Sequence, residues 1–262
     1  MGNEKKTWKK PKLKRAMARF TELWTAQKNK GAFPSLVDCP EGPNVLVLSP
    51  HPDDDILGCG GTLAKHKKAG HTITSVTLTD GSFGDPSIPD RDVLIRKREE
   101  ESQRAARIIG ISRCEFLREK DQKLGTKGPI IQKIGALLDE IEPDLLYLPF
   151  FLDNHPDHVA THRIFYRVAQ KKTVRTKCCF YETWAPLYPN ILVDVSDEMA
   201  IKVRAIKEYE TQLKHYDYVR ICKGLNTYRS MLFGAKSEFA EAFYRLSIEE
   251  YLSLFKIVWE DL

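Results

Sequence analysis

Short apolar runs alternate with longer segments of helical periodicity through the middle of the chain. Residues 45–48 and 73–79 are rich in Val, Ile, Leu and Thr and are bounded by turn residues, which is typical of buried strands. Between them, a helical pattern extends from about residue 60 to residue 69. A strand, a helix and a second strand joined by short links form the βαβ unit of a parallel sheet.

The same alternation continues as far as residue 149. Residues 92–109 are strongly charged, but positions three and four residues apart form one helical face, and Gly110 follows as a C-cap. That face carries Leu94, Arg98, Glu101, Ala105 and Ile108. The next expected elements are a strand, a helix and a strand, at residues 114–117, 129–141 and 144–149. The pattern therefore predicts an α/β fold with a Rossmann-like, doubly wound and mostly parallel sheet.

The pattern is less regular towards the C-terminus. We expect a strand at residues 191–195 and a long charged helix at residues 198–215. A helical tail is expected from Ser237 onward. No internal repeat accompanies these elements, so they are interpreted as extensions of the same domain.

The length and the apolar content are sufficient for one hydrophobic core. The chain has 262 residues, of which 42% are hydrophobic, and it contains no run of about 18 apolar residues. Its basic, polar start is unlike a signal peptide, and its six cysteines form no C-x-x-C pair. Neither a disulfide framework nor a thiolate zinc cage is indicated. We expect one cytoplasmic domain over residues 41–262, preceded by a basic extension over residues 1–40.

Most of the formal charge of +5 lies in that N-terminal extension. Lysines and arginines crowd residues 5–19, and large apolar side chains are interleaved with them and follow them: Trp8, Met17, Phe20, Leu23 and Trp24. This composition is compatible with an amphipathic helix on an anionic membrane surface, with a solvated tail and with a helix packed on the domain. Peripheral membrane contact is therefore an expectation for this arm, and nucleic acid is not an expected partner.

The first cluster of reactive side chains follows the strand at residues 45–48. It is the turn Pro50-His51-Pro52-Asp53-Asp54-Asp55. Adjacent carboxylates repel one another unless a cation or a helix N-terminus compensates their charge, and a divalent metal offers the largest compensation. An N-capping turn at the start of a helix also explains the aspartates. Both interpretations stay open for this motif taken alone.

The second cluster, Asn154-His155-Pro156-Asp157-His158, follows the strand at residues 144–149. The carboxyl ends of parallel strands lie at one rim of the sheet, so the two H-P-D turns are expected to meet there. Catalytic zinc takes three protein ligands of the His and Asp type and keeps one position open for water. The two turns together therefore predict a metal site.

Four short motifs resemble those of the LmbE-like, or PIG-L, family of zinc-dependent N-deacetylases. They are His51-Pro52-Asp53-Asp54, Thr79-Asp80-Gly81, Arg98-x-x-Glu101 and His155-Pro156-Asp157-His158. A weaker similarity continues at residues 209–213 and 240–243. The resemblance implies one Zn²⁺ ion in a Rossmann-like fold and hydrolysis of an N-acetyl or other N-acyl amide on a glucosamine-type sugar conjugate.

The resemblance also implies roles for individual residues. His51, Asp54 and His158 would bind zinc, and Asp53 would be the general base. His155 would be a positively charged imidazolium that stabilises the oxyanion, oriented by Asp157.

The resemblance also indicates candidate substrate-binding residues, and the sequence departs from the family pattern at one position. Arg98 matches a family arginine on the substrate side, and together with Asp80 and Asn154 it is a candidate for pairing with sugar hydroxyls. The family has Glu where this chain has Asp55, which makes the contact of that shorter carboxylate an open question.

Amide hydrolysis agrees with these roles on chemical grounds. It needs a water nucleophile, a site for the oxyanion and a proton for the departing amine, and a zinc ion, Asp53 and His155 would supply them. The alternatives are a metal-dependent hydrolase of another bond, such as a phosphoester, and a non-catalytic module that binds anionic lipid or nucleic acid through the basic arm.

The remaining histidines and glycines are weaker signals. We expect His66, His71 and His162 to be surface residues or supports rather than ligands, and we do not assign His215 to the substrate pocket. The glycines at 58, 60 and 61 lack the spacing and the acidic partner of a dinucleotide-binding fingerprint, so NAD is not expected.

Overall fold

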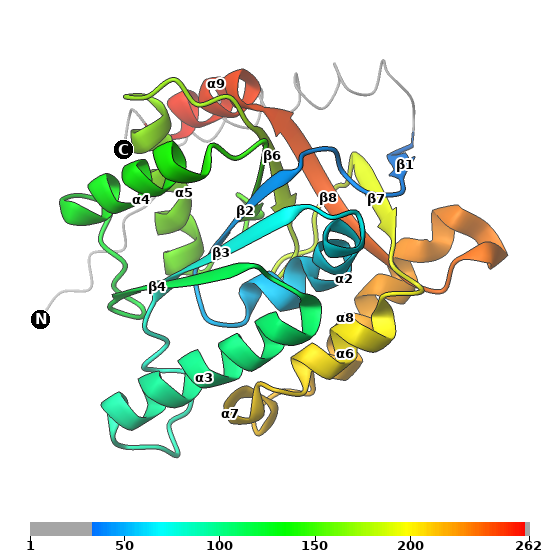
Figure 1. The fold of residues 1–262 in the computed structure, drawn as a ribbon, viewed down its shortest axis with the longest axis horizontal. Helices are drawn as coiled ribbons and strands as arrows, with labels where there is room; N and C mark the ends of the chain where they lie inside the picture. The colour runs from blue at the N-terminus through cyan, green and yellow to red at the C-terminus, as the bar shows by residue number, and fades with distance from the viewer. Residues whose placement is uncertain (1–32, 260–262) are drawn as a thin grey trace, which may run out of the picture.

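The computed structural model describes residues 33–259 of the chain, and the basic arm falls outside these residues. An eight-stranded sheet runs through the described part, in the order β1-β7-β8-β6-β5-β2-β3-β4 (Figure 1). Its strands are β1 (Ser35–Val37), β2 (Asn44–Ser49), β3 (Thr72–Thr79), β4 (Arg113–Glu119), β5 (Leu145–Pro149), β6 (Lys177–Tyr181), β7 (Ile191–Asp194) and β8 (Ala240–Ser247). β8 is antiparallel to both of its neighbours, and the other pairings are parallel.

Helices cover both faces of this sheet (Figure 1). They are α2 (Asp54–Lys68), α3 (Arg91–Ile109), α4 (Pro129–Ile141), α5 (Pro156–Ala169), α6 (Met199–Ile206), α7 (Glu210–Leu213), α8 (Tyr218–Arg229), the 3-10 helix η1 (Ser230–Lys236) and α9 (Ile248–Trp259). In the described residues no helix is long and apolar enough to cross a membrane.

The core is split between the two faces because successive strand residues point to opposite sides. In β2, Leu46 and Leu48 pack into the cluster beneath α4, α5 and α9, whereas Val45 and Val47 pack into the cluster beneath α2, α3 and α6. A strand buried on both faces must be apolar at nearly every position. This burial explains the continuous apolar runs from which the strands were predicted.

The order of the parallel strands places the functional motifs. From β2 the chain proceeds outward to β3 and β4 and then returns to β5, which pairs with β2 on the other side. The strand order therefore reverses between β2 and β5. At such a switch point the connections leave in opposite directions and open a crevice outside the carboxyl ends of the strands.

Most elements confirm the expected pattern of the first 150 residues. Helix α4 has the predicted bounds, and α3 ends at Gly110, whose φ of 92° is the left-handed conformation that glycine adopts readily. Helix α2 begins at Asp54, earlier than expected, because the second and third aspartates of the motif form its first turn. Strand β1 pairs with β7, so the folded domain begins before residue 41.

Two expectations for the C-terminal part are wrong. The long charged helix is interrupted after Ile206 and resumes as α7, because the backbone at the buried Tyr209 is not helical. Residues 240–247 form a strand inside the sheet rather than the start of a helical tail, and α9 begins only at Ile248. The charged Glu241 is buried in that strand, so its polarity does not mark a solvent-facing position.

Candidate active site

The first H-P-D motif is the tight connection from β2 to α2. The Ser49 hydroxyl donates to the carbonyl of His51 (2.6 Å) and accepts from the amide of Asp55 (3.1 Å), which closes the turn. Asp53 is the N-cap residue of α2, and Asp54 begins the helix. The aspartates therefore also face the positive end of a helix dipole. Asp53 thus occupies the N-cap position without a capping hydrogen bond from its side chain, and the metal interpretation of the motif stays a prediction.

The second motif connects β5 to α5. His155 is the N-cap residue, and its Nδ1 accepts a hydrogen bond from the amide of Asp157 (3.3 Å). His158 lies in the first turn of α5 and is fully buried. Since β5 is paired with β2, the two turns meet as predicted, with the ring centroids of His51 and His155 4.6 Å apart.

The three predicted zinc ligands converge on one carboxylate oxygen. Oδ2 of Asp54 lies 3.0 Å from Nδ1 of His51 and 3.2 Å from Nε2 of His158. That Nε2 atom is buried and has no hydrogen-bond partner of acceptable geometry in the described part of the structure. Buried polar atoms are almost always paired, so an unpartnered imidazole nitrogen beside a carboxylate fits a metal ligand.

Two groups of side chains around His51 have the spacing of metal ligands, and neither contains Asp54. One contains His51, His155 and His158, and the other contains His51, Asp121 and Asp157. The ligand atoms within each group lie within 4.8 Å of one another. His51 is thus the common centre of a cation-binding cluster.

The charges in the cluster are balanced by protons when no cation is bound. Burial lowers the pKa of His158, but the carboxylates of Asp54 and Asp153 outweigh this effect and raise it to about 9. The pKa of His51 is raised well above its usual value in the same way, and that of Asp54 is held well below its usual range despite its burial. A divalent cation would replace these imidazole protons, so its affinity falls as the pH falls.

Two carboxylates in this cluster were missed in the sequence. Oδ2 of Asp153 accepts from Nδ1 of His158 (3.0 Å), from the hydroxyl of Thr183 (3.1 Å) and from the amide of Trp184 (3.2 Å). This is the arrangement in which a carboxylate orients a metal-binding histidine. Its position two residues before the second H-P-D turn was the sequence signal that could have placed Asp153 in the site.

The other missed carboxylate is Asp121, which follows β4. Its Oδ1 lies 3.5 Å from Nε2 of His51, and its Oδ2 accepts from the amide of Phe83 (3.0 Å). No short motif contains this residue. Only its place at the end of a parallel strand indicated that it would reach the same rim.

Arg98 braces the predicted general base. Its guanidinium, buried under the β3–α3 loop, donates to Oδ2 of Asp53 (3.2 Å) and to the carbonyl of Gly81 (3.0 Å). A Cβ at Gly81 or at Gly84 would lie 2.5 Å from Nη1 of Arg98, so a side chain at either position would displace the guanidinium. Burial raises the pKa of Asp53, and the charge of Arg98 opposes that rise.

The structure corrects the expected roles of His155 and Asp157. The Asp157 carboxylate contacts Nε2 of His51 (3.3 Å) rather than His155, and it also accepts from the backbone amides of Gln122 and Leu124. Burial and the neighbouring charges of His51 and His158 lower the pKa of His155. Both effects favour the neutral form of the imidazole over the charged form that was expected. Because its Nδ1 accepts from an amide, its proton is on Nε2.

A cavity of about 450 Å³ opens beside this cluster. Its lining includes His51, Asp53, Asp54, Arg98 and His155, and aromatic side chains form part of its wall: Phe83, Trp184, Tyr216 and Tyr218. A larger cavity of about 940 Å³ lies beside β1, β7 and β8 and contains none of the motif residues. The chemistry, and not the volume, identifies the smaller cavity as the candidate site.

Two of the three predicted substrate-binding residues do not line this cavity. Oδ1 of Asp80 accepts from the amides of Ser82 (3.0 Å) and Asp121 (3.2 Å), so Asp80 shapes the loop after β3. Asn154 is exposed and also lies outside the lining. Gln212, from the weaker similarity at residues 209–213, does line the cavity.

The remaining histidines do not line the cavity. Nε2 of His162 lies 2.9 Å from the Pro149 carbonyl, and burial lowers the pKa of this residue to about 3. Nε2 of His215 contacts Asp85 (3.0 Å). His66 is fully buried, so of the two expected locations, the surface or a supporting position, it does not occupy the surface.

Asp55, at the position where the family has Glu, reaches the neighbouring strand β3. Its Oδ2 accepts from the hydroxyl of Ser75 (2.6 Å), and its Oδ1 accepts from the amide of Ile56 (2.8 Å). Burial raises its pKa to about 7. The shorter side chain is thus fully engaged beneath the site.

Comparisons with known proteins agree with this geometry. Residues 46–169 match the family described as PIG-L, GlcNAc-PI de-N-acetylase. A protein named diacetylchitobiose deacetylase from Thermococcus kodakarensis is 28% identical over 216 residues, which are 74% of this chain and 79% of that protein.

Two solved structures share the fold. N,N'-diacetylchitobiose deacetylase from Pyrococcus horikoshii has a TM-score of 0.71 and 22% identity, over 80% of this chain and 86% of that one. A 4-carboxy-2-hydroxymuconate hydratase from Pseudomonas putida has a TM-score of 0.66 and 20% identity, over 77% of this chain and 95% of that one. The fold alone therefore does not decide the reaction. The motifs and the family match together identify residues 46–169 as a PIG-L (LmbE-like) domain, and the relatives of the chain are named as deacetylases.

Proposed function

We propose that this protein hydrolyses an N-acetyl amide on a glucosamine-type sugar conjugate, in a zinc-dependent reaction that releases acetate and a free amine. The relatives named as deacetylases of such sugars support the substrate class. The observation that carries the chemistry is the buried carboxylate oxygen of Asp54 between two imidazoles, one of which has an unpartnered nitrogen.

We assign the metal to His51, Asp54 and His158. Two imidazoles and one carboxylate form a ligand set that zinc uses in catalytic sites, with a fourth position left for water. A zinc ion bound there would lower the pKa of a water towards about 7 and polarise the acyl carbonyl. Asp153, behind His158, would hold that imidazole in orientation.

Asp53 is the proposed general base. It lines the cavity next to the proposed ligand Asp54, and its raised pKa suits a group that must accept a proton and release it again. Arg98 holds one carboxylate oxygen through Nη2, which orients the side chain. Asp53 would receive the proton of the attacking water and return it to the departing amine.

His155 is the proposed donor to the oxyanion. Its Nδ1 is occupied by the amide of Asp157, so Nε2 carries the proton, and the ring lines the cavity. A neutral N–H donor stabilises the developing negative charge without adding a positive charge beside the metal. We therefore keep His155 as the residue that stabilises the oxyanion, but as a neutral donor instead of the expected imidazolium.

The cavity supports a sugar substrate. Its volume of about 450 Å³ lies in the range of small-molecule sites, and aromatic rings stand beside polar groups from Arg98, Gln122 and Gln212. Polar groups that are left unpaired when an analogue lacks a hydroxyl discriminate against that analogue. A flexible acetyl-lysine side chain would leave these groups unpaired.

The test is acetate release at equal zinc occupancy. We expect kcat/KM for N-acetylglucosamine conjugates to exceed that for acetyl-lysine peptides by a factor of about 10² or more, since matched hydroxyls contribute strongly to discrimination. Phosphoester substrates and chelated enzyme serve as controls. Equal values for the two acetyl substrates, or turnover of phosphoesters alone, would contradict the proposal.

A further inference from the structure

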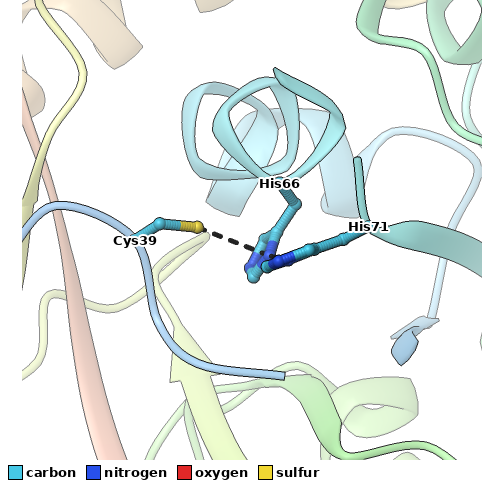
Figure 2. Close-up of side chains that lie close together, drawn as sticks. All are labelled: Cys39, His66 and His71. Carbon is cyan, nitrogen blue, oxygen red and sulfur yellow. Dashed lines mark hydrogen bonds between the residues drawn. The ribbon is translucent and has the colours of Figure 1, made fainter. Parts of the chain in front are cut away.

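A second cluster of metal-binding side chains lies at the opposite end of the sheet, at the amino ends of β2 and β3. Cys39 lies in the loop between β1 and β2, His66 in the last turn of α2, and His71 in the turn before β3. Figure 2 shows the sulfur of Cys39 and both imidazole rings pointing towards one another. Three separate segments thus bring one thiol and two imidazoles together.

The distances are close to those of a metal site. Sγ of Cys39 lies 3.4 Å from Nδ1 of His66, which lies 2.8 Å from Nδ1 of His71, and all three atoms are within 4.8 Å of one another. Tetrahedral zinc, with bonds of about 2.3 Å to sulfur and about 2.0–2.1 Å to nitrogen, separates ligand atoms by about 3.3–3.6 Å. Binding of an ion would require the two Nδ1 atoms to move apart, and the half-buried His71 is the more exposed of the two histidines.

His66 is held in the orientation that a metal needs. Its Nε2 lies 2.9 Å from the hydroxyl of Tyr147, which is fully buried, and its Nδ1 faces Cys39 and His71. A partner on the far ring nitrogen is the usual support of a metal-binding histidine. Burial and the neighbouring His71 lower the pKa of His66 to about 3, so the ring is in its neutral, ligating form.

Nucleophilic catalysis is a poor explanation of the same cluster. A catalytic cysteine needs a lowered pKa, whereas burial and the nearby Asp38 raise the pKa of Cys39 to about 11. A plain hydrogen bond between the two Nδ1 atoms explains their contact. The thiol is also within hydrogen-bond distance of Nδ1 of His66, but one imidazole nitrogen has either a single proton or a single lone pair and cannot make both hydrogen bonds fully.

We propose that Cys39, His66 and His71 bind a zinc ion, with water as the fourth ligand. The ion would connect the loop before β2 to the turn between α2 and β3, and the thiol proton of Cys39 would be released to solvent on binding. This zinc site is distinct from the proposed catalytic site and does not depend on it, because the catalytic cluster contains no sulfur ligand.

Cobalt substitution tests this zinc site. A cobalt ion bound to a thiolate produces a charge-transfer absorption in the near ultraviolet, which nitrogen and oxygen ligands alone do not produce. Titration of the full, metal-free chain with Co²⁺ should produce this band. It should be absent from Cys39→Ser and unchanged in the control Cys114→Ser, which alters another partly buried cysteine.

The outcomes separate the two sites. His71→Asn should weaken the binding of the band-producing cobalt at least tenfold and leave substrate turnover of the zinc-loaded enzyme unchanged. Circular dichroism of each metal-free variant checks that it is folded. A folded wild-type chain without the band at saturating cobalt, or a band that persists in Cys39→Ser, would overturn the second site whatever the result at the catalytic cluster.

Discussion

Two adjacent aspartates illustrate how position alone divides chemical roles between identical side chains. Asp53 points towards a guanidinium, and Asp54 points between two imidazoles. Burial raises the pKa of both, but only for Asp54 do the facing charges reverse the effect. The first can therefore exchange a proton, while the second stays ionised and able to bind a cation.

Substitutions of these two aspartates should have different effects. Asp53→Asn should retain zinc while kcat falls by about 10²–10⁴, the usual contribution of a general base. Asp54→Asn should lose most of the zinc, because the shared carboxylate oxygen becomes neutral. Elemental analysis and acetate release measure the two effects. Loss of zinc in Asp53→Asn to the same extent would show that the two roles are assigned in reverse.

At the scale of elements, a buried ion pair joins the C-terminal strand to the rest of the domain. Glu241 of β8 accepts from Nζ of Lys202 in α6 (2.7 Å) and from the amides of Gly61 (2.8 Å) and Thr62 (2.7 Å) in α2. Both charged side chains are almost completely buried. One carboxylate thus connects three elements behind the active-site cavity.

Removal of the cation from this pair should destabilise the fold. Lys202→Met leaves the Glu241 carboxylate buried without its cation, which costs about 3–5 kcal/mol of unfolding free energy. The control Lys177→Met removes a half-exposed lysine from its pair with the exposed Glu41, at a cost of about 0–1 kcal/mol. Urea denaturation measures both. Equal losses of unfolding free energy in the two variants would show that the buried ion pair stabilises the fold no more than the exposed pair does.

The elements also differ in how far they could be predicted. The periodicity of α3 and α4 and the apolar runs of β2, β3 and β5 are local signals, and they were sufficient. In β8 the pattern of apolar residues is ambiguous because it is interrupted by the charged Glu241. This residue is buried together with its ion-pair partner Lys202. Long-range pairing of this kind leaves no local signal in the sequence.

For the whole molecule, the sheet separates two clusters of ligating side chains. The proposed catalytic cluster lies at the carboxyl ends of β2 and β5, and the cluster of Cys39, His66 and His71 lies at the amino end of the sheet, before β2 and β3. Helix α2 contributes to both clusters, with Asp54 at its start and His66 in its last turn. A change in one cluster can therefore be measured with the other as an internal reference.

The basic arm remains a prediction for the whole molecule. Deletion of residues 1–30 should leave kcat unchanged on a soluble substrate, because the cavity is lined by residues of the described domain. Binding to anionic vesicles should weaken, since each Lys or Arg near such a surface contributes about 1 kcal/mol. Co-sedimentation compares the two chains, with neutral vesicles as the control. Equal sedimentation of both with anionic vesicles would exclude a role of the arm in membrane contact.

The resemblance to the PIG-L family, the α/β fold and the meeting of the two H-P-D turns were all predicted from the sequence alone. These follow from local periodicity, from short motifs and from the rule that parallel strands carry their sites at one rim. His51, Asp54 and His158 could be named as proposed metal ligands because the family resemblance assigns that role to their motif positions, and each motif follows a predicted strand.

Only the tertiary structure decided which groups face one another. It directed Asp157 to His51 instead of His155, placed Asp153 behind His158 and brought Cys39 to His66. Charge states follow from such contacts, because burial and facing charges set the pKa of each group. Charge states depend on side chains that are distant in sequence, and for that reason the lowered pKa of His155 was not apparent before the fold was known.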